Sequence, residues 1–410
     1  MLARLLRLFA DVRKGEERVA LLLTANVFFL LLAYYLLKVV REPLILAGGG
    51  AEVKTYAAAL QAVLLIPTVR AYGAISRRFG RTRLISVVTL FFASNLVLFF
   101  ALAKLHVPLG VPFYLWVGIF NVTAIAQFWS FASDVYDEET GKRIFPLVGV
   151  GSAVGAIAGA RIAKTLLLSL GPYALMLVAA AIITLALIFV RSVDAGAPKE
   201  QPVASASDGF SLLLRDRYLL LVGALTMLLN WVNTMGEYVL DRTLVSVLGD
   251  NAVAIGAFKA DYFAWVNGVG LCLQLFVVSR LFKVIGVRGA LFVLPLVSLS
   301  GYGALAFFPV LGLIAVAKVA ENSLDYSLQN TARQALFLVT TREEKYQAKA
   351  AIDTFLVRVG DVLAAVTVFV GTRLHLSTSR FVAFNVVLVL SWLSVVRLLG
   401  RAHREREART

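Results

Sequence analysis

The fold class is decided by the stretch Gly171-Pro-Tyr-Ala-Leu-Met-Leu-Val-Ala-Ala-Ala-Ile-Ile-Thr-Leu-Ala-Leu-Ile-Phe-Val190, which contains no charged residue. Its length is close to the roughly 20 residues that an α-helix needs to cross the hydrocarbon core of a bilayer. The whole chain shares this character, since 60% of its 410 residues are hydrophobic and 16% are charged. Soluble domains carry about 25% charged residues. The sequence therefore predicts an all-α integral membrane protein.

About twelve apolar stretches of this kind follow one another along the chain. They run near Arg18–Lys38, Thr55–Ile75, Leu84–Leu105, Val111–Val135, Phe145–Leu168, Gly171–Val190, Tyr218–Leu240, Ala257–Leu281, Gly289–Phe308, Val310–Gln334, Ala348–Gly371 and Ser379–Leu399. The single cysteine, Cys272, excludes a disulfide framework and a cysteine-based zinc site. No catalytic or nucleotide-hydrolysing motif is present, so we expect no enzyme, no cofactor and no metal site.

A polar linker at residues 192–217, rich in Gly, Pro and Ser, divides the chain into two parts. Residues 1–191 hold an N-terminal amphipathic segment and six apolar stretches, residues 218–399 hold the other six, and residues 400–410 form a basic tail. Loop motifs recur between the parts: Gly80 corresponds to Gly286, and the glutamate pair at Glu138 corresponds to the pair at Glu343. This repetition predicts two pseudo-symmetric six-helix halves of the major facilitator type.

The lysine and arginine residues indicate how the chain is oriented. About 26 of them fall in the termini and the even-numbered loops, and about eight fall in the odd-numbered loops. Because basic residues favour the cytoplasmic side, both termini are expected in the cytoplasm of a bacterial-type inner membrane. The net charge of +15 is spread over seven short segments rather than gathered on one domain. It therefore does not predict nucleic-acid binding.

Polar side chains recur at helical spacing in every third apolar stretch. The four stripes are Tyr34, Lys38 and Arg41; Thr123, Gln127, Ser130 and Asp134; Asn230, Asn233, Glu237 and Asp241; and Lys318, Asn322, Asp325, Gln329 and Arg333. A charge at the bilayer centre costs about 2.5–3.5 kcal/mol on insertion scales. Helices one, four, seven and ten line the central cavity of a twelve-helix transporter built from parallel repeats, so the stripes predict a substrate path. Its basic members suit an anion.

Three segments resemble the bacterial and plastid ATP/ADP translocases, the Tlc-type nucleotide transporters. They are Tyr35-Leu-Leu-Lys-Val-Val-Arg-Glu-Pro-Leu-Ile45; Gln127-Phe-Trp-Ser-Phe-Ala-Ser-Asp134 with Lys142-Arg-Ile-Phe-Pro-Leu-Val-Gly-Val-Gly151; and Lys349-Ala-Ala-Ile-Asp353. The resemblance implies nucleotide transport within the major facilitator fold. It also implies a role for Arg41, Asp134 and Lys349, with Glu237 as the nearest acid of the seventh helix.

The expected function is a monomeric secondary transporter, an antiporter that exchanges ATP/ADP-type nucleotides or related phosphorylated anions by alternating access. Expected substrate contacts come from Lys38, Arg41, Asp134, Glu237, Lys318, Asn322 and Lys349, and an expected coupling or charge network comes from Glu321, Asp325 and Asp353. Lys318 either grips the substrate or only neutralises Glu321. One alternative is a proton-coupled facilitator or exporter of another organic anion or lipid-like solute, with Glu237, Glu321 and Asp325 as proton sites. A second alternative is a non-transporting scaffold.

The charge asymmetry makes a prediction about topology. An alkaline phosphatase reporter fused after Thr410, and another inserted near Ala197, should both be inactive because both sites are cytoplasmic. A fluorescent protein at the same two positions should fluoresce. Phosphatase activity at either position would show that the orientation is wrong.

Overall fold

The computed structural model describes residues 13, 15–76, 78–136, 138–193, 213, 215–341, 344, 348–349 and 351–408. Within these ranges the chain is helical and contains no strand. The predicted N-terminal amphipathic segment and the predicted linker lie largely outside the described residues. The predicted basic tail is no separate element, because the last helix continues through it to Glu407.

The helices follow one another in a simple order. They are α2 (Glu17–Ser76), α3 (Arg81–Lys104), α4 (Gly110–Val135), α5 (Glu138–Arg191), α7 (Arg217–Leu248), α8 (Ala252–Cys272), α9 (Val278–Phe307), α10 (Leu311–Leu324), α11 (Asn330–Ala335), α13 (Val357–Arg373) and α14 (Thr378–Glu407). Short π-helical turns, η1 (Leu273–Val277), η2 (Asp325–Gln329) and η4 (Ile352–Leu356), and a 3-10 turn, η3 (Leu336–Val339), join or precede some of them.

Three of the helices are broken by a glycine. The backbone has a positive φ at Gly50 in α2, at Gly171 in α5 and at Gly286 in α9. Glycine adopts this conformation at little cost because it has no Cβ. The breaks divide three helical runs that are too long for one crossing, Glu17–Ser76, Glu138–Arg191 and the continuous run Ala252–Phe307, into two segments each. The described ranges then contain the twelve predicted segments. Among the described residues, seven helices are long and apolar enough to cross a membrane, which confirms a multi-pass membrane protein.

The first segment of α2 continues well beyond its predicted end at Lys38. It runs on to the break at Gly50, because Arg41 and Glu42 neutralise each other across 2.7 Å and do not end the helix. Ile45 and Leu46, which follow them, are buried. Arg41 and Glu42 therefore lie within the helix rather than at its end.

The chain forms two compact units. Unit 1 contains Met1–Gly49, Val63–Gln201 and Asp250–Asn267. Unit 2 contains Gly50–Ala62, Pro202–Gly249 and Gly268–Thr410. Each unit therefore includes one short segment that is flanked in sequence by the other unit.

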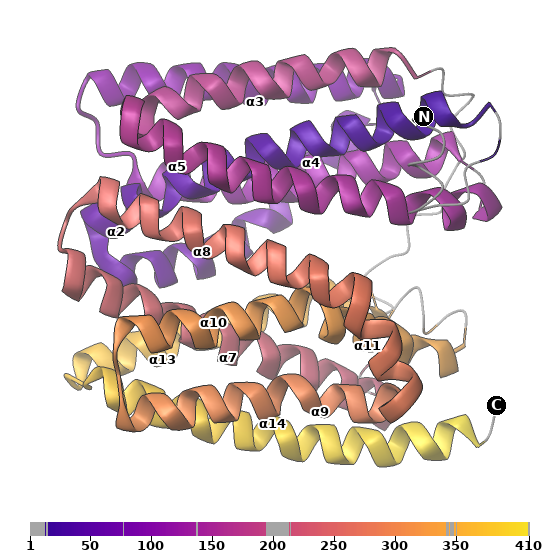
Figure 1. Cartoon of the computed structure of the whole chain (residues 1–410), viewed down its shortest axis with the longest axis vertical. Coiled ribbons are helices and arrows are strands. Elements are labelled where there is room, and N and C mark those ends of the chain that lie inside the picture. Colours follow the sequence, from indigo (N-terminus) through magenta and orange to yellow (C-terminus); the bar gives the residue numbers. More distant parts are fainter. Residues whose placement is uncertain are drawn as a thin grey trace. The chain divides into compact units, whose positions relative to one another are not determined.

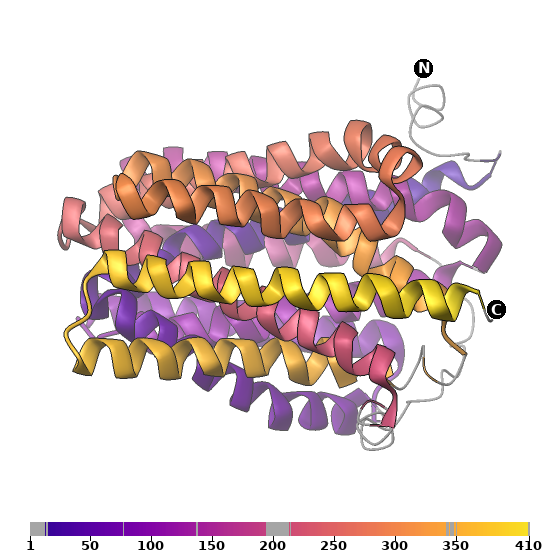
Figure 2. The ribbon, with the colours of Figure 1, turned by 90° about the horizontal axis from the view of Figure 1, so that it is seen from below.

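Unit 2 is organised around α7. This helix packs against α10, α13 and α14, while α14 also packs against α9 (Figure 1). The view in Figure 2 shows α7 alongside both α13 and the yellow α14. Tyr238, Trp392 and Tyr302 are among the largest fully buried side chains of this unit.

In unit 1, α5 packs closely on the first segment of α2. Three glycines four residues apart, Gly151, Gly155 and Gly159, lie against Thr24, Phe28 and Leu32 in turn. A Cβ at Gly155 or Gly159 would overlap the backbone of the neighbouring helix, and one at Gly151 would overlap the side chain of Thr24. Small residues at this spacing let two membrane helices approach closely.

This close approach generates a prediction. Gly155→Ala should force α5 away from Phe28 and destabilise the protein by about 1–3 kcal/mol, the usual cost of overpacking. Gly149→Ala is the matched control, because nothing lies within 4 Å of a Cβ at Gly149 on the same helix. Thermal unfolding in detergent should show a lower Tm for Gly155→Ala and an unchanged or higher Tm for the control. Equal Tm values would contradict the packing.

Candidate functional site

The lysine network of unit 2 is centred on Lys318, which is 0% exposed on α10. Its Nζ lies 2.6 Å from Asn233 Oδ1, 3.2 Å from the Asn233 carbonyl oxygen and 3.1 Å from Glu321 Oε2. A lysine ammonium group has three hydrogens to donate. Groups of the protein therefore accept all three, and α7 and α10 are tied together by them.

Two carboxylates complete the lysine network, which comprises Asn233, Glu237, Tyr302, Lys318, Glu321 and Asn322. Glu321 is buried and its Oε2 also accepts the hydroxyl hydrogen of Tyr302, at 2.6 Å. Glu237 Oε1 accepts from Asn322 Nδ2 at 2.9 Å and lies 3.8 Å from Lys318 Nζ. The Glu237 side chain is 25% exposed. Glu237 is thus the charged member that is most accessible.

The structure brings together four predicted site residues here: Glu237, Lys318, Glu321 and Asn322. Its geometry favours the interpretation in which Lys318 neutralises buried acid over the one in which it grips substrate. Asp325, in η2, makes no hydrogen bond or ion pair with any side chain in the described ranges. It stays within electrostatic reach of Arg333 and Glu321.

A second cluster, the aromatic lysine site, lies in unit 1 and comprises Tyr34, Tyr35, Lys38, Phe263 and Asn267. Lys38 Nζ is 4.2 Å from the ring centroid of Phe263 and 5.1 Å from that of Tyr35. Tyr35 donates its hydroxyl hydrogen to Asn267 Oδ1 at 3.0 Å. Cations bind favourably over the faces of such rings. The half-buried Lys38 ammonium is therefore held beside aromatic surface.

Arg41 lies one turn further along α2. Its Nη2 and Nε donate to Glu42 Oε1 at 2.7 and 3.1 Å, and its guanidinium group lies 4.4 Å from the ring centroid of Tyr114. Glu42 Oε2 is 3.9 Å from the Nζ of Lys259, and both side chains are buried. Sequence reasoning missed Lys259, because α8 begins five residues before the predicted Ala257 and the lysine therefore lies deeper than expected.

The other predicted site residues lie at the ends of their elements. Asp134 is half-buried in the last turn of α4. Lys349 Nζ lies 5.9 Å from the ring centroid of Phe337, and Asp353 is exposed in η4. These three residues thus lie on three different elements or turns of the chain.

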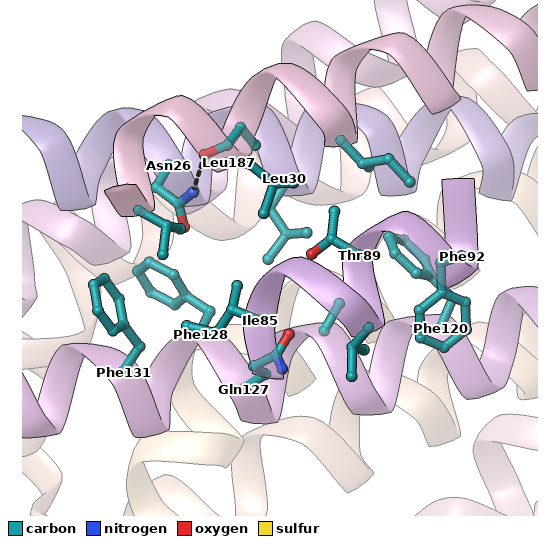
Figure 3. Close-up of a pocket in the computed structure, with 15 residues that line it drawn as sticks. Asn26, Leu30, Ile85, Thr89, Phe92, Phe120, Gln127, Phe128, Phe131 and Leu187 are labelled. Atoms are coloured by element: carbon teal, nitrogen blue, oxygen red, sulfur yellow. Dashed lines mark hydrogen bonds between the residues drawn. The ribbon is translucent and has the colours of Figure 1, made fainter. Parts of the chain in front are cut away.

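A small cavity in unit 1 is a poor candidate for a substrate site. It lies among α2, α3, α4 and α5, and its lining is mostly apolar apart from Asn26, Thr89 and Gln127 (Figure 3). Its volume of about 40 Å³ accommodates a few water molecules. In the part of the chain that the structure describes, no group of three His, Cys, Asp or Glu side chains could hold a metal ion.

The lysine network generates a prediction about stability. Lys318→Met should destabilise the protein by about 3–5 kcal/mol, because it leaves Glu321 as a buried charge without its lysine. Adding Glu321→Gln should recover much of this loss. The exposed pair Arg13–Glu139 is the control, since Glu139→Gln there should cost about 0–1 kcal/mol. Thermal unfolding of these three variants and the unmodified protein decides the matter, and a double variant less stable than Lys318→Met would contradict the pairing.

Comparison with known proteins gives distant relatives. No family model matches the chain. Over 286 residues the chain is 25% identical to ADP,ATP carrier protein 1 of Chlamydia muridarum, a match that covers 58% of this chain and 54% of that protein. The protein of the same name from Chlamydia pneumoniae is 23% identical over 288 residues, with 58% and 56% covered. The chain spans about half the length of the curated relatives it matches.

Solved structures match over nearly the whole chain. The transporter PepTSo of the POT family has a TM-score of 0.70 at 11% identity, with 96% of this chain and 99% of that chain covered. A mutant of the nucleoside transporter NupG has a TM-score of 0.67 at 12% identity, with 95% and 99% covered. These proteins, like the Chlamydia relatives, are named as carriers or transporters and not as enzymes. The chain is therefore similar in sequence to ADP,ATP carrier proteins over somewhat more than half of its length, and it shares the all-helical fold of these solved transporters.

Proposed function

We propose that this protein is a secondary transporter that exchanges ATP/ADP-type nucleotides, or related phosphorylated anions, across a bacterial-type inner membrane by alternating access. The observation that carries the proposal is the pair of cations Lys38 and Arg41, three residues apart on α2 in unit 1. Both lie beside aromatic rings: Lys38 near Phe263, and Arg41 over Tyr114. A nucleotide needs both features, cations for its phosphates and ring surface for its base.

The balance of charge supports unit 1 as the anion-binding part. In the described part of α2 and α8, ion pairs place Arg41 and Lys259 on the same acid, Glu42, and Lys38 lies one turn before Arg41. The lysine network of unit 2 has the opposite balance, because its one lysine faces two carboxylates. In surroundings of low dielectric constant such a difference acts strongly on a multiply charged anion.

The distant relatives support the nucleotide as substrate, because they are named ADP,ATP carrier proteins. Arg41 lies in one of the segments that resemble the translocases, as do Asp134 and Lys349. We propose that these three residues either contact the phosphate groups of the nucleotide or control its entry to the binding site. The monomeric state and the cytoplasmic termini belong to the same proposal.

A proton-coupled carrier is the second candidate, and one observation favours it. Glu237 is a partly exposed carboxylate on a membrane helix, and it lies 3.8 Å from Lys318. A carboxylate placed in this way can gain and lose a proton while the nearby lysine compensates its charge. In that case an imposed pH gradient, rather than internal nucleotide, drives uptake.

One experiment separates these functions. Purified protein in proteoliposomes is offered labelled ATP or ADP, with and without internal unlabelled ADP, and with or without an imposed pH gradient. Uptake that requires internal nucleotide supports exchange, and uptake driven by the pH gradient supports proton coupling. No uptake in any arm would contradict the proposed nucleotide transport and leave two alternatives, a proton-coupled carrier of another solute and a non-transporting scaffold.

Lys38 provides the sharpest prediction. Lys38→Gln should lower nucleotide exchange about tenfold or more, since a lost charge-assisted contact to phosphate is worth on the order of 1.5–3 kcal/mol. Lys104→Gln is the matched control, because Lys104 Nζ also lies over a phenylalanine ring, 5.4 Å from the centroid of Phe100, but on the exposed side of α3. Equal exchange rates in the two variants, both with unchanged Tm, would rule out the phosphate contact.

A further inference from the structure

Each unit contains one short segment whose neighbours in the sequence belong to the other unit. Gly50–Ala62 lies in unit 2 although the residues on both sides of it lie in unit 1. Asp250–Asn267 lies in unit 1 although the residues on both sides of it lie in unit 2. A glycine with positive φ marks the start of each segment, with φ of 72° at Gly50 and 59° at Gly249. Each unit therefore contributes one segment to the other, and both segments begin at or directly after such a glycine.

Each exchanged segment carries a lysine that pairs with an acid of its host unit. In unit 2, Lys54 Nζ lies 2.6 Å from Asp241 Oδ2. In unit 1, Lys259 Nζ lies 3.9 Å from Glu42 Oε2. Both acids are buried. In each pair, the lysine comes from one half of the sequence and the acid from the other.

The two pairs occupy equivalent positions in the repeats. Glu42 and Asp241 are 199 residues apart, which is also the separation of Gly50 and Gly249. The lysines Lys54 and Lys259 are 205 residues apart, the separation that relates the two glutamate-pair loops. Each acid therefore precedes its glycine by eight residues, while Lys54 follows its glycine by four residues and Lys259 follows its glycine by ten. The order of acid, glycine and lysine is thus the same in both halves, although the spacing of the lysines differs.

We propose that Lys54–Asp241 and Lys259–Glu42 are matched latches that fasten the two exchanged segments to their host units, and that their release is part of the conformational cycle. The first part of the proposal is structural, and only the second rests on transport by alternating access. Removing one member of a buried pair leaves an unpaired charge, so each segment should loosen when its own latch is broken.

The two latches differ in how far their lysine side chains are exposed to water. Lys259 is 0% exposed, and Arg41 also pairs with its acid, Glu42. Lys54 is 11% exposed. Its segment is also held by Tyr238, which donates its hydroxyl hydrogen to Glu52 Oε1 at 2.8 Å, and by a ring contact between Tyr56 and Phe369. The second segment has two further ion pairs, in which Arg161 and Lys164 lie 3.2 and 2.5 Å from Asp261. Water reaches the Lys54 latch more easily, so we infer that it releases first.

The experiment measures the position of each segment directly. Cys272 is the only cysteine, so Cys272→Ser gives a cysteine-free full-length protein. Single cysteines then replace Ala57 in the first segment or Ala260 in the second, both of which are buried. The rate of maleimide labelling in liposomes reports how often each segment opens. Ala332→Cys, buried in α11, is the control position.

The expected pattern is reciprocal. Asp241→Asn should raise labelling at position 57 about fivefold or more and leave position 260 unchanged, because only the first latch is broken. Glu42→Gln should do the reverse, and neither variant should change labelling at position 332. In the unmodified background, position 57 should label faster than position 260.

A variant in which the two charges are exchanged distinguishes a broken latch from general misfolding. The double variant Lys54→Asp/Asp241→Lys keeps a pair of opposite charges and should restore slow labelling at position 57. Equal labelling of both segments in Asp241→Asn, or no change in either, would overturn the latches, as would a failure of the charge exchange to restore slow labelling. These results do not depend on uptake, so they remain valid if nucleotide exchange is not found.

Discussion

The rest of the structure depends on one constraint: a charged group cannot remain unpaired in the apolar interior of a membrane protein. Lys318 and Lys259 are both fully buried, and each lies near a carboxylate. To bring Lys318 to its acceptors, α7 and α10 must approach closely. Gly236 permits this approach, because a Cβ there would overlap the hydroxyl group of Tyr302 and crowd Lys318. Pairing of charge thus determines which helices touch and where small residues are required.

The same constraint separates groups that hold the fold from groups that can act on a solute. The ammonium hydrogens of Lys318 are all taken up within the protein, so its charge serves the internal balance. Glu237 is attached to that balance but partly exposed, so it is the member that can respond to a proton or a ligand. Lys38 is half-buried beside the rings of Tyr35 and Phe263, a setting that favours a cation. The chemistry expected of the protein therefore belongs to the partly exposed members.

Hydrophobicity and helical spacing were sufficient to predict the twelve segments and the polar stripes, because both depend on local sequence. The pair Lys318–Glu321 was also predictable, since residues three apart on a helix are neighbours. The link from Lys318 to Asn233 joins residues 85 positions apart, and no local pattern reveals it. Lys259 was missed because a lysine close to a predicted helix end resembles an interface residue. The predicted end of the first helix, at Lys38, was wrong because the adjacent opposite charges of Arg41 and Glu42 suggest a helix boundary, whereas they pair within the helix.

Comparison of the two repeats shows where symmetry is kept and where it is lost. At a separation of 199 residues Glu42 corresponds to Asp241, and both are buried acids that face a lysine. At the same separation Lys38 corresponds to Glu237, so the charge is reversed only one turn away. A structural pair has the same task in both halves, whereas a site for an asymmetric solute gains from unlike groups. The positions that diverged between the repeats are thus the ones best suited to recognise a molecule with a charged end and an uncharged end.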